Sequence, residues 1–487
     1  MSLLNDLSEI GQGKLLHQKM RIAGELVGNE RRIEVFNPYT GALLGSVPKA
    51  SLADVQHAFR SAKQYKSRLT RFERSQIMLR AAAIMRANAE AISSLITAEA
   101  GLCKKDTLYE VGRACDVFLF AANQALVDDG QVFSCDLTPH GKQRKVYTLR
   151  EPLLGAISAI TPFNHPLNQV AHKVAPAIAT NNRMVLKPSE KTPFSALLLA
   201  DILYQAGLPP EMFSVITGDP REIADEMLTN SDIDLVTFTG GVQIGKYIAG
   251  KAVYKRQVLE LGGNDPIIVM EDANLEEAAT LAVSGSYKNS GQRCTAVKRM
   301  IVHEAVADQF VELLCAKTRA IKYGDPMDAN NDMGTVIDEA AAIAFEAKVK
   351  DAVAHGAKLL LGNERRGALY APTVLDHVPY DCKLVADETF GPVSPVIRCK
   401  DIADAIRISN STPYGLSSSV CTNRLDYITR FVRELEVGTV NVREVPGYRL
   451  ELTPFGGIKD SGLGYKEGVL EAMKSFCNTK TYSLPWE

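Results

Sequence analysis

A cysteine surrounded by cations stands in the segment NSGQRCTAVKR. Arg293 directly precedes Cys294, and Lys298 and Arg299 follow closely. A neighbouring cation lowers the pKa of a thiol and favours the nucleophilic thiolate. The same residues are also typical of a buried structural cysteine beside a surface arginine. This segment alone leaves both interpretations open, and the other polar segments of the chain decide between them.

Two further segments have residue types that suit phosphate and ribose binding. Gly240, Gly241 and Gly245 lie in GGVQIG, between an apolar run and a helical pattern. Such a turn lets backbone N–H groups and a helix N-terminus approach a pyrophosphate. In KPSE, Lys187 and Glu190 stand three residues apart, and a carboxylate there can accept hydrogen bonds from ribose hydroxyls. The structural alternatives are a glycine turn and a solvated ion pair.

These segments follow short apolar runs that alternate with stretches long enough for helices. The runs are residues 153–160, 183–187, 213–217, 235–239 and 257–261. Their alternation is typical of a doubly wound parallel sheet, in which ligands bind at the carboxyl ends of the strands. A second alternating set begins at residues 266–270, continues through 298–303 and extends to about residue 475, which predicts a second α/β domain.

The first third of the chain has helical patterns. SLADVQHAFRSAKQY begins with Ser51 and Asp54 at capping-box spacing, and a longer pattern continues from Phe72 until Gly101 stops it. Residues 133–152 and the final NTKTYSLPWE fit neither alternating set. The former segment predicts a two-stranded ribbon. Because an isolated ribbon is barely stable in water, we expect it to pair with another chain.

Composition limits the class of protein. A chain of 487 residues exceeds what one hydrophobic core usually organises. With 55 basic and 57 acidic side chains, it has no global attraction to nucleic acid or to an anionic membrane. Nine cysteines show no CxxC pair and no Cys–His pairing at metal spacing. Together with the lack of a long apolar run, this predicts a cytoplasmic protein with reduced thiols and no metal site.

The ordered segments TPFNHP, KPSE, FTGG, LELGG, GQRC, ETFGPV and PFGGIKDSG resemble the aldehyde dehydrogenase superfamily over the whole chain. The resemblance implies the aldehyde dehydrogenase α/β fold, with a doubly wound NAD-binding domain of residues 1–130 and 153–264. It further implies an α/β catalytic domain of residues 265–473 and a β-ribbon oligomerisation arm of residues 131–152 and 474–487. A homodimer or homotetramer is the expected assembly.

The resemblance also implies three catalytic roles. Cys294 matches the nucleophile, Glu260 in LELGG matches the general base, and Asn164 in TPFNHP matches the amide that stabilises the oxyanion. The three roles form a coherent reaction. A thiolate adds to an aldehyde carbonyl, the resulting oxyanion needs hydrogen-bond donors, and the later thioester needs a base that activates water.

The implied cofactor is NAD. The residues that match cofactor-binding positions are Lys173, Lys187, Ser189, Glu190, Gly240, Gly241, Gly245, Glu388 and Phe390. Glu388 and Phe390, in ETFGPV, resemble the residues that hold the nicotinamide ribose and ring. A carboxylate at Glu190 would repel a 2′-phosphate, which favours NAD over NADP. Gly241 departs from the serine that is common at this position in the family.

Four cationic or potentially cationic residues indicate the substrate. His165 follows the catalytic asparagine where many relatives have an aromatic residue, and Arg293 precedes the cysteine where an uncharged residue is frequent. Arg113 occupies a position that looks into the substrate tunnel in the family's fold, and Arg449 lies in the loop that lines the tunnel mouth. Buried charges of one sign are costly unless a counter-charge arrives, so these residues predict a small aldehyde with an anionic group.

Several alternatives remain open. Arg113 and Arg449 would not contact substrate if they paired with carboxylates such as Glu110 or Glu451. Within the superfamily, YEVGRA, SCDLTPHGK, TPFNHPLN, KNSGQRCTAVKR and EVPGYR are most similar to the phosphonoacetaldehyde dehydrogenases, which implies a phosphonate as the anion. The other candidates are glyceraldehyde 3-phosphate, lactaldehyde and succinic semialdehyde as substrates, a coenzyme-A-acylating enzyme, a cysteine hydrolase, and a protein that keeps the fold without catalysis.

Overall fold

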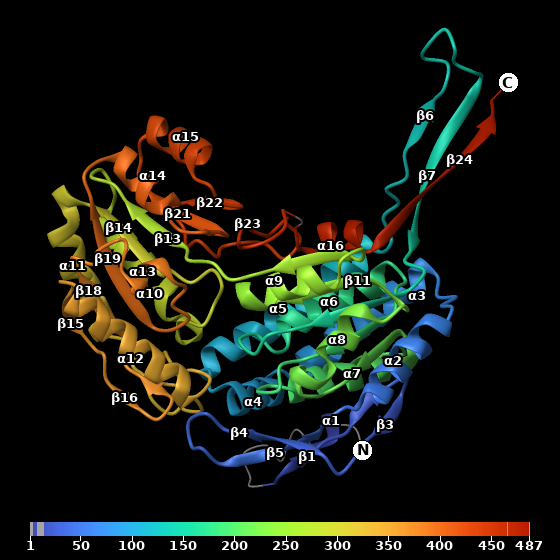
Figure 1. Ribbon diagram of the computed structural model, residues 1–487, viewed down its shortest axis with the longest axis horizontal. Helices are drawn as coiled ribbons and strands as arrows, with labels where there is room; N and C mark the ends of the chain where they lie inside the picture. The colour runs from blue at the N-terminus through green and yellow to red at the C-terminus, as the bar shows by residue number, and fades with distance from the viewer. Residues whose placement is uncertain (1–2, 7–13, 465, 487) are drawn as a thin grey trace.

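The computed structural model describes residues 3–6, 14–464 and 466–486 and contains two seven-stranded sheets (Figure 1). The first sheet has the strand order β12-β11-β8-β9-β10-β2-β3. Its strands are β2 (Met20–Ile22), β3 (Glu25–Val27), β8 (Ala156–Ile160), β9 (Met184–Lys187), β10 (Phe213–Val215), β11 (Ile233–Thr239) and β12 (Arg256–Glu260). The five strands from β8 to β12 are parallel, which confirms the doubly wound sheet predicted from the apolar runs.

Helices cover both faces of the first sheet because alternate strand residues point to opposite sides. Ile157 and Leu186 belong to the core beneath one group of helices, whereas Ala156 and Val185 belong to the core on the other face. The first group contains α3 (Arg71–Ala87), α4 (Ala89–Ala100), α5 (Lys104–Gln124), α6 (Asn168–Ala179) and α7 (Phe194–Gln205). The second group contains α2 (Leu52–Gln64), α8 (Pro220–Thr229) and α9 (Val242–Lys251).

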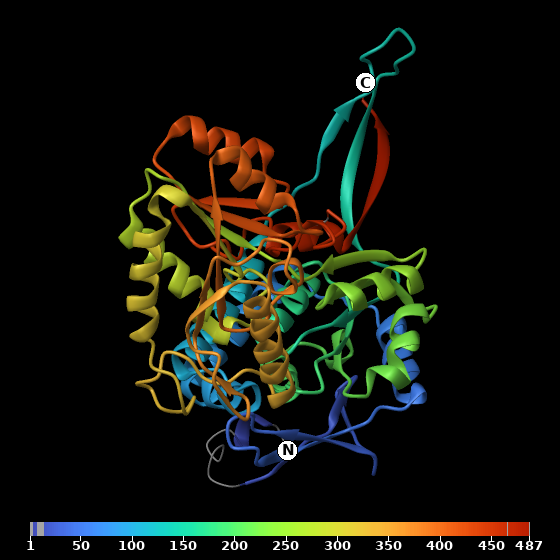
Figure 2. The same cartoon turned by 60° about the vertical axis from the view of Figure 1, so that its left-hand side comes forward.

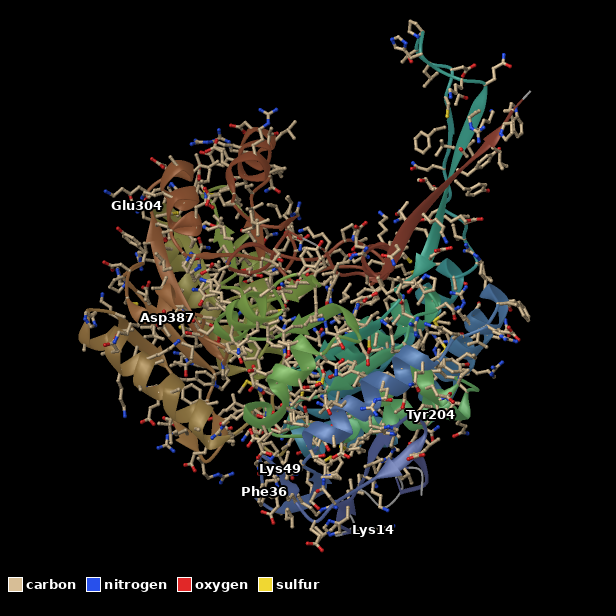
Figure 3. The ribbon with its side chains drawn as sticks, turned by 45° about the vertical axis from the view of Figure 1, so that its right-hand side comes forward. Lys14, Phe36, Lys49, Tyr204, Glu304 and Asp387 are labelled. Carbon is tan, nitrogen blue, oxygen red and sulfur yellow. The ribbon has the colours of Figure 1, made fainter. Side chains whose placement is uncertain are left out.

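The second sheet lies on the other side of the molecule, in yellow to red in Figure 1. Its strand order is β15-β18-β19-β14-β13-β21-β22. The strands are β13 (Pro266–Val269), β14 (Arg299–His303), β15 (Lys358–Leu361), β18 (Thr373–Asp376), β19 (Val393–Cys399), β21 (Ser417–Cys421) and β22 (Thr439–Val442). Its main helices are α10 (Leu275–Tyr287), α11 (Glu304–Arg319), α12 (Glu339–Ala354), α14 (Ile402–Asn410) and α15 (Leu425–Glu434). Figure 3 shows Asp387 on this side and Tyr204, from α7, on the side of the first sheet.

The N-terminal third differs from its helical prediction in two places. Short strands occupy much of residues 16–48, where β1 (Leu16–His17), β4 (Arg32–Phe36) and β5 (Leu43–Pro48) form a small sheet. Strands of two to six residues are too short to develop a clear alternation. The pattern from Phe72 to Gly101 is also interrupted, because Asn88 leaves helical geometry and separates α3 from α4. The capping box of Ser51 and Asp54 is confirmed.

A three-stranded arm projects from the body of the protein, as both cartoon views show (Figures 1 and 2). It consists of β6 (Val132–Ser134), β7 (Arg144–Pro152) and β24 (Cys477–Pro485), with β7 in the centre. The predicted ribbon therefore pairs with a distant strand of its own chain, from the C-terminal segment that the family resemblance assigned to the same arm. Pairing of the arm with another chain remains a prediction. None of the helices among the described residues is long and apolar enough to cross a membrane.

Candidate active site

A cavity of about 210 Å³ brings the three predicted catalytic residues together. Asn164 follows β8, Glu260 is the last residue of β12, and Cys294 lies between the short 3₁₀ helix η3 (Lys288–Gly291) and β14. All three line the cavity, and Glu388 and Phe390 line it as well. Two of these positions lie where strands of the parallel sheet end, as expected for a ligand site of this architecture.

The Cys294 thiol is influenced more by Lys298 and Arg449 than by Arg293, its neighbour in the chain. Burial raises the pKa of Cys294 to about 11, and the charges of Lys298 and Arg449 are the main ones that lower it. The adjacent Arg293 donates instead from Nη2 to the Gly285 carbonyl at 2.8 Å. The structure therefore gives little support to Arg293 as the main activator of the thiol.

The Asn164 amide is held in place by the segment that precedes the cysteine. Its Nδ2 donates to the Gln292 carbonyl at 2.8 Å, which leaves its second hydrogen for another acceptor. Asn289 in turn donates from Nδ2 to the Asn164 carbonyl at 3.2 Å. Asn289 and Ser290 have φ angles of 55° and 53°, and the Asn289 N–H donates to Asp106 at 2.7 Å. Left-handed backbone at two consecutive non-glycine residues is strained, and such strain is concentrated at functional sites.

Glu260 is a buried carboxyl group without a hydrogen-bond partner for either oxygen among the described residues. Burial, and then the charge of Glu467, raise its pKa well above the ordinary value. Glu467 accepts a hydrogen bond from Lys173 Nζ at 2.7 Å, and Lys173 also donates to Thr237 at 3.0 Å. Lys173 was predicted to bind the cofactor, and in the structure its ammonium group is bonded to Glu467. No motif in the sequence pointed to Glu467.

The glycines after β11 have different physical roles. Gly241 is the N-cap of α9, it has no side-chain cap, and a Cβ built there meets nothing within 4 Å. This turn therefore faces open space, as a pyrophosphate site requires. Gly245 is needed for packing, because a Cβ there would lie 2.4 Å from the Leu261 side chain. A Cβ on Gly240 would likewise lie 2.4 Å from the ring of Phe238.

The proposed adenosine-ribose residues lie at the end of β9. Lys187 is buried, and its Nζ lies 3.0 Å from the Pro188 carbonyl and 3.4 Å from the Glu190 carboxylate. The Glu190 side chain is 42% exposed and lines a second cavity of about 460 Å³. Ser189 Oγ accepts from the Lys191 N–H at 3.2 Å. The Glu190 carboxylate is therefore accessible to a ribose, and the buried Lys187 forms an ion pair with this carboxylate.

The proposed nicotinamide residues form one wall of the smaller cavity. Phe390 packs edge to face with Phe163, with ring centroids 6.0 Å apart. Glu388 Oε1 accepts from Lys298 Nζ at 2.7 Å and from the Gly263 N–H at 3.2 Å. An aromatic wall, an accessible carboxylate and an open glycine turn fit a nicotinamide dinucleotide.

Arg113 and Arg449 differ in their partners. Arg113 Nε donates to Glu451 in a largely buried ion pair, and His172 Nε2 lies 2.5 Å from the same carboxylate. Arg449 has no carboxylate within ion-pair distance among the described residues, and its Nη1 is buried without a hydrogen-bond partner. The guanidinium group instead stacks 3.9 Å from the ring centre of Phe455. The ion-pairing alternative therefore applies to Arg113 and not to Arg449.

The loop that carries Arg449 packs directly against the nucleophile segment. Gly447 is so close to Thr295, the residue after Cys294, that a Cβ on Gly447 would lie 2.3 Å from Thr295 Oγ1. Arg293 also contributes an unpartnered group, because its Nε is buried without an acceptor among the described residues. Two guanidinium groups with unused donors thus belong to segments on either side of Cys294.

His165 and Lys288 complete the polar surroundings. His165 Nδ1 lies 3.1 Å from Asn289 Nδ2 and 3.5 Å from Glu110, and burial lowers the histidine pKa, which favours the neutral ring. Lys288 Nζ lies 3.3 Å from the centre of the Tyr109 ring, and burial lowers its pKa to about 8. The sequence analysis did not select Lys288, although the residue belongs to the same KNSGQRC segment as Arg293.

Lys298 and Arg299 are buried on the other side of the nucleophile segment. Lys298 bonds to backbone carbonyls and to Glu388. Arg299 donates to the carbonyls of Asn264, Ile408 and Ser409 at 2.7 to 3.0 Å. These two cations therefore fix the start of β14 and, with it, the position of the segment that carries Cys294.

Known proteins are similar to this chain in sequence over nearly their whole length. The aldehyde dehydrogenase family profile matches residues 26–482. The 3-sulfolactaldehyde dehydrogenase of Priestia aryabhattai is 38% identical over 464 residues, which cover 95% of this chain and 97% of the relative. The sulfoacetaldehyde dehydrogenase of Neptuniibacter caesariensis is 34% identical over 449 residues, which cover 91% of this chain and 98% of the relative.

Solved structures agree with this assignment. Aldehyde dehydrogenase 21 from Physcomitrella patens, in complex with the reaction product succinate, has a TM-score of 0.94 and 34% identity, covering 97% of this chain and 99% of that chain. The NADP-dependent glyceraldehyde-3-phosphate dehydrogenase from Bacillus halodurans, complexed with NADP, has a TM-score of 0.93 and 36% identity, covering 97% and 100%. The chain thus belongs to the aldehyde dehydrogenase family and is an oxidoreductase that acts on aldehydes.

Proposed function

We propose that this enzyme oxidises a small anionic aldehyde, with phosphonoacetaldehyde as its substrate and phosphonoacetate as its product. The observation that carries the proposal is Arg449, whose buried Nη1 has no partner among the described residues and whose charge lowers the pKa of Cys294. The charge of Arg449 acts on Glu260, Glu451 and Glu467, but the guanidinium group forms no ion pair with a carboxylate among the described residues. A buried donor without an acceptor is costly, so a substrate anion that accepts from Nη1 would relieve that cost. Arg293 supports the proposal with its own unpartnered Nε.

The remaining candidate residues would act around the same anion. Only Nε of Arg113 bonds to Glu451, so its two terminal nitrogens are still available as donors. His165, as a neutral ring, would donate one N–H to an oxygen of the substrate. A phosphonate has three oxygens and accepts hydrogen bonds from several donors at once, which suits this group of residues better than an alkyl chain does.

The chemical step follows from the cavity residues. The Cys294 thiolate would add to the aldehyde carbon, and the free hydrogen of Asn164 Nδ2 would donate to the developing oxyanion. NAD, when bound, supplies the hydride acceptor. Loss of a hydride from the aldehyde carbon to that acceptor would leave a thioester on Cys294 Sγ. Water would then attack the thioester while Glu260 removes a proton from it, and the C–S bond would break to release the carboxylate product and the Cys294 thiolate. Glu260 lines the same cavity and has both oxygens free for that water.

NAD is the proposed cofactor because of Glu190. Its carboxylate is accessible at the end of β9 and would accept hydrogen bonds from the 2′- and 3′-hydroxyls of an adenosine ribose. A 2′-phosphate would bring a second negative charge to the same place. The relative from Bacillus halodurans binds NADP, so the preference must be tested on this chain itself.

The proposal extends to the organisation of the chain. We assign the cofactor to residues 1–130 and 153–264 and the nucleophile to residues 265–473, although residues 1 and 2 and 7–13 lie outside the described residues. Residues 131–152 and 474–487, of which 487 is not described, would form the oligomerisation arm of a cytoplasmic homodimer or homotetramer. The exposed Leu149, Tyr482 and Leu484 provide apolar surface on this arm for a second copy.

Sulfonated aldehydes are the second candidate substrates. Two relatives are named for 3-sulfolactaldehyde and sulfoacetaldehyde, and a sulfonate presents three oxygens in the same tetrahedral arrangement as a phosphonate. The two anions differ in charge, because a phosphonate can carry a second negative charge. Arg293 and Arg449, which form no ion pair with a carboxylate among the described residues, favour the more highly charged anion.

The test is the rate of NADH formation over a panel of aldehydes with NAD and with NADP. Phosphonoacetaldehyde should have a kcat/KM at least about 100-fold above that of propanal, since each charge-assisted hydrogen bond contributes about 1.5 to 3 kcal/mol. Sulfoacetaldehyde, 3-sulfolactaldehyde, glyceraldehyde 3-phosphate, lactaldehyde and succinic semialdehyde complete the panel. A neutral aldehyde that equalled the best anionic one would refute the proposal, and a better sulfonated aldehyde would reassign the anion.

A further inference from the structure

Lys298 connects three parts of the active site through one ammonium group. Its Nζ donates to the Cys294 carbonyl at 2.6 Å, to the Gly263 carbonyl at 2.6 Å and to Glu388 Oε1 at 2.7 Å. An ammonium group has three donors, so all of its hydrogens are used. The side chain is only 1% exposed. Lys298 therefore holds the backbone of the nucleophile at a fixed position relative to Glu388.

The Glu388 carboxylate fits closely against the LELGG turn. Its Oε1 also accepts from the Gly263 N–H at 3.2 Å. A Cβ built on Gly262 would lie only 2.1 Å from Glu388 Oε2, so a glycine is needed there for the carboxylate to approach. Glu388 and Cys294 line the same cavity. The Glu388 carboxylate thus contacts Lys298 and also lines the cavity in which a ribose would bind.

The charges around the thiol come from four different segments. After burial, the groups that act on the pKa of Cys294 are Lys298 and Arg449, which lower it, and Asp265 and Glu388, which raise it. Lys298 precedes β14, Arg449 follows β22, Asp265 precedes β13, and Glu388 precedes β19. Lys298 and Glu388 are the only two of these four that form an ion pair with each other among the described residues.

We propose that Lys298 is a positioning residue, through which the location of the Glu388 carboxylate sets the charge that the Cys294 thiol experiences. While Glu388 accepts from Lys298, the two charges offset each other near the sulfur. When Glu388 turns toward another donor, its charge offsets that of the ammonium group less completely near the sulfur. The inference rests on the proposed function, in which the other donors are the ribose hydroxyls of the cofactor.

The test measures alkylation of Cys294 by iodoacetamide in the full-length protein without cofactor. The thiolate is the reacting form, so below the thiol pKa each unit of pKa changes the rate about tenfold. Lys298→Met should slow alkylation at pH 8 by about tenfold, and Lys298→Arg should restore at least half of that loss on a logarithmic scale. Glu388→Gln should speed alkylation by about threefold or more, because it removes the opposing charge and keeps a similar shape.

Two other cysteines serve as internal references when the alkylated protein is digested and its labelled peptides are quantified. Cys135, on the arm, is partly exposed, so its alkylation rate should be equal in all variants. Cys421 is buried in the second sheet, so labelling of Cys421 reports unfolding. The inference is overturned if Lys298→Met leaves the ratio of Cys294 to Cys135 alkylation unchanged, or if Glu388→Gln lowers it. This measurement needs no aldehyde, so its failure is distinguishable from failure of the substrate proposal.

Discussion

Arg113 and Glu451 form a largely buried ion pair that joins α5 to the loop carrying Arg449. His172, on α6, bonds to the same carboxylate. Arg113 and Glu451 are 338 residues apart in the chain. One carboxylate thus fixes the loop that presents Arg449, so Arg113 has a structural role in addition to any contact with substrate.

Loss of this carboxylate should destabilise the protein. Glu451→Gln would leave Arg113 largely buried without its counter-charge, and breaking a buried ion pair typically costs about 3 to 5 kcal/mol. Because the Arg113 side chain is 20% exposed, we expect a smaller loss of about 2 to 3 kcal/mol in the free energy of unfolding, measured with urea. Glu436→Gln, which breaks the surface pair with Lys459, is the control and should change the free energy by less than about 1 kcal/mol. Equal losses in both variants would contradict the argument.

Arg449→Met should separate anionic from neutral substrates. The variant removes donors for the substrate anion, so kcat/KM for phosphonoacetaldehyde should fall about 10-fold to 100-fold, as one charge-assisted hydrogen bond contributes about 1.5 to 3 kcal/mol. The kcat/KM for propanal should change several-fold at most. Arg443→Met, on the same loop but paired at the surface with Glu277, is the matched control. If kcat/KM fell equally for both aldehydes, Arg449 would act through the pKa of the Cys294 thiol and not through the substrate anion.

Asn164→Ala should lower kcat and leave KM for the aldehyde nearly unchanged. Removal of one oxyanion donor typically lowers kcat about 100-fold to 1,000-fold, because the interaction forms only as charge develops. The side chain also donates to the Gln292 carbonyl, so a thermal melt must show that the variant is folded. A variant that is folded and fully active would exclude the amide from the oxyanion site.

Glu467→Gln should move the pH dependence of kcat to lower pH. Burial and the charge of Glu467 raise the pKa of Glu260, so Glu260 stays protonated at pH values where an ordinary carboxyl is ionised. Without the Glu467 charge, the pKa of Glu260 falls and the basic form is present at lower pH. The acidic limb of the kcat profile should shift accordingly. The control is Glu471→Gln, which breaks a surface pair with Lys474 and should leave the pH profile of kcat unchanged. If Glu467→Gln also kept the profile of the unaltered protein, a group other than Glu260 would limit the acidic limb.

Glu190→Ser should weaken the preference for NAD over NADP. Two unit charges about 4 Å apart near a surface interact by about 1 to 4 kcal/mol, so the ratio of kcat/KM for NADP to that for NAD should rise about tenfold or more. The control is Glu34→Ser, because Glu34 is another carboxylate that lines the 460 Å³ cavity beside Glu190. If the two substitutions changed the ratio equally, the effect would come from the general charge of the cavity.

The sequence predicts best what depends on neighbouring residues. The strand-end segments with Asn164 and Glu260 could be placed because alternating apolar runs locate the ends of parallel strands, whereas Cys294, which precedes β14, was assigned from the family resemblance. The doubly wound sheet is confirmed for the same reason. The small N-terminal sheet escaped prediction because its strands are only two to six residues long.

Contacts between distant residues could not be predicted from one sequence. Glu467 affects Glu260 and binds Lys173, yet these residues lie in separate segments that only the folded chain brings together. The same limit applies to Arg113, because its pairing with Glu451 was one of two open alternatives until the structure separated it from Arg449. The strand that completes the arm pairs with a ribbon more than 300 residues earlier in the chain, since Thr479 lies opposite Arg150, and only the family resemblance had placed the two segments together.

Lys298 and Arg299 point in opposite directions, and this fixes the number of residues that can stand between Cys294 and β14. Consecutive residues of extended chain point to opposite sides, and here one side holds Glu388 whereas the other holds the carbonyls of Ile408 and Ser409. Inserting or deleting one residue between Cys294 and Lys298 would exchange these two directions, leaving an ammonium where a guanidinium group is needed. Variation in this loop is therefore expected as substitution, while its length stays the same.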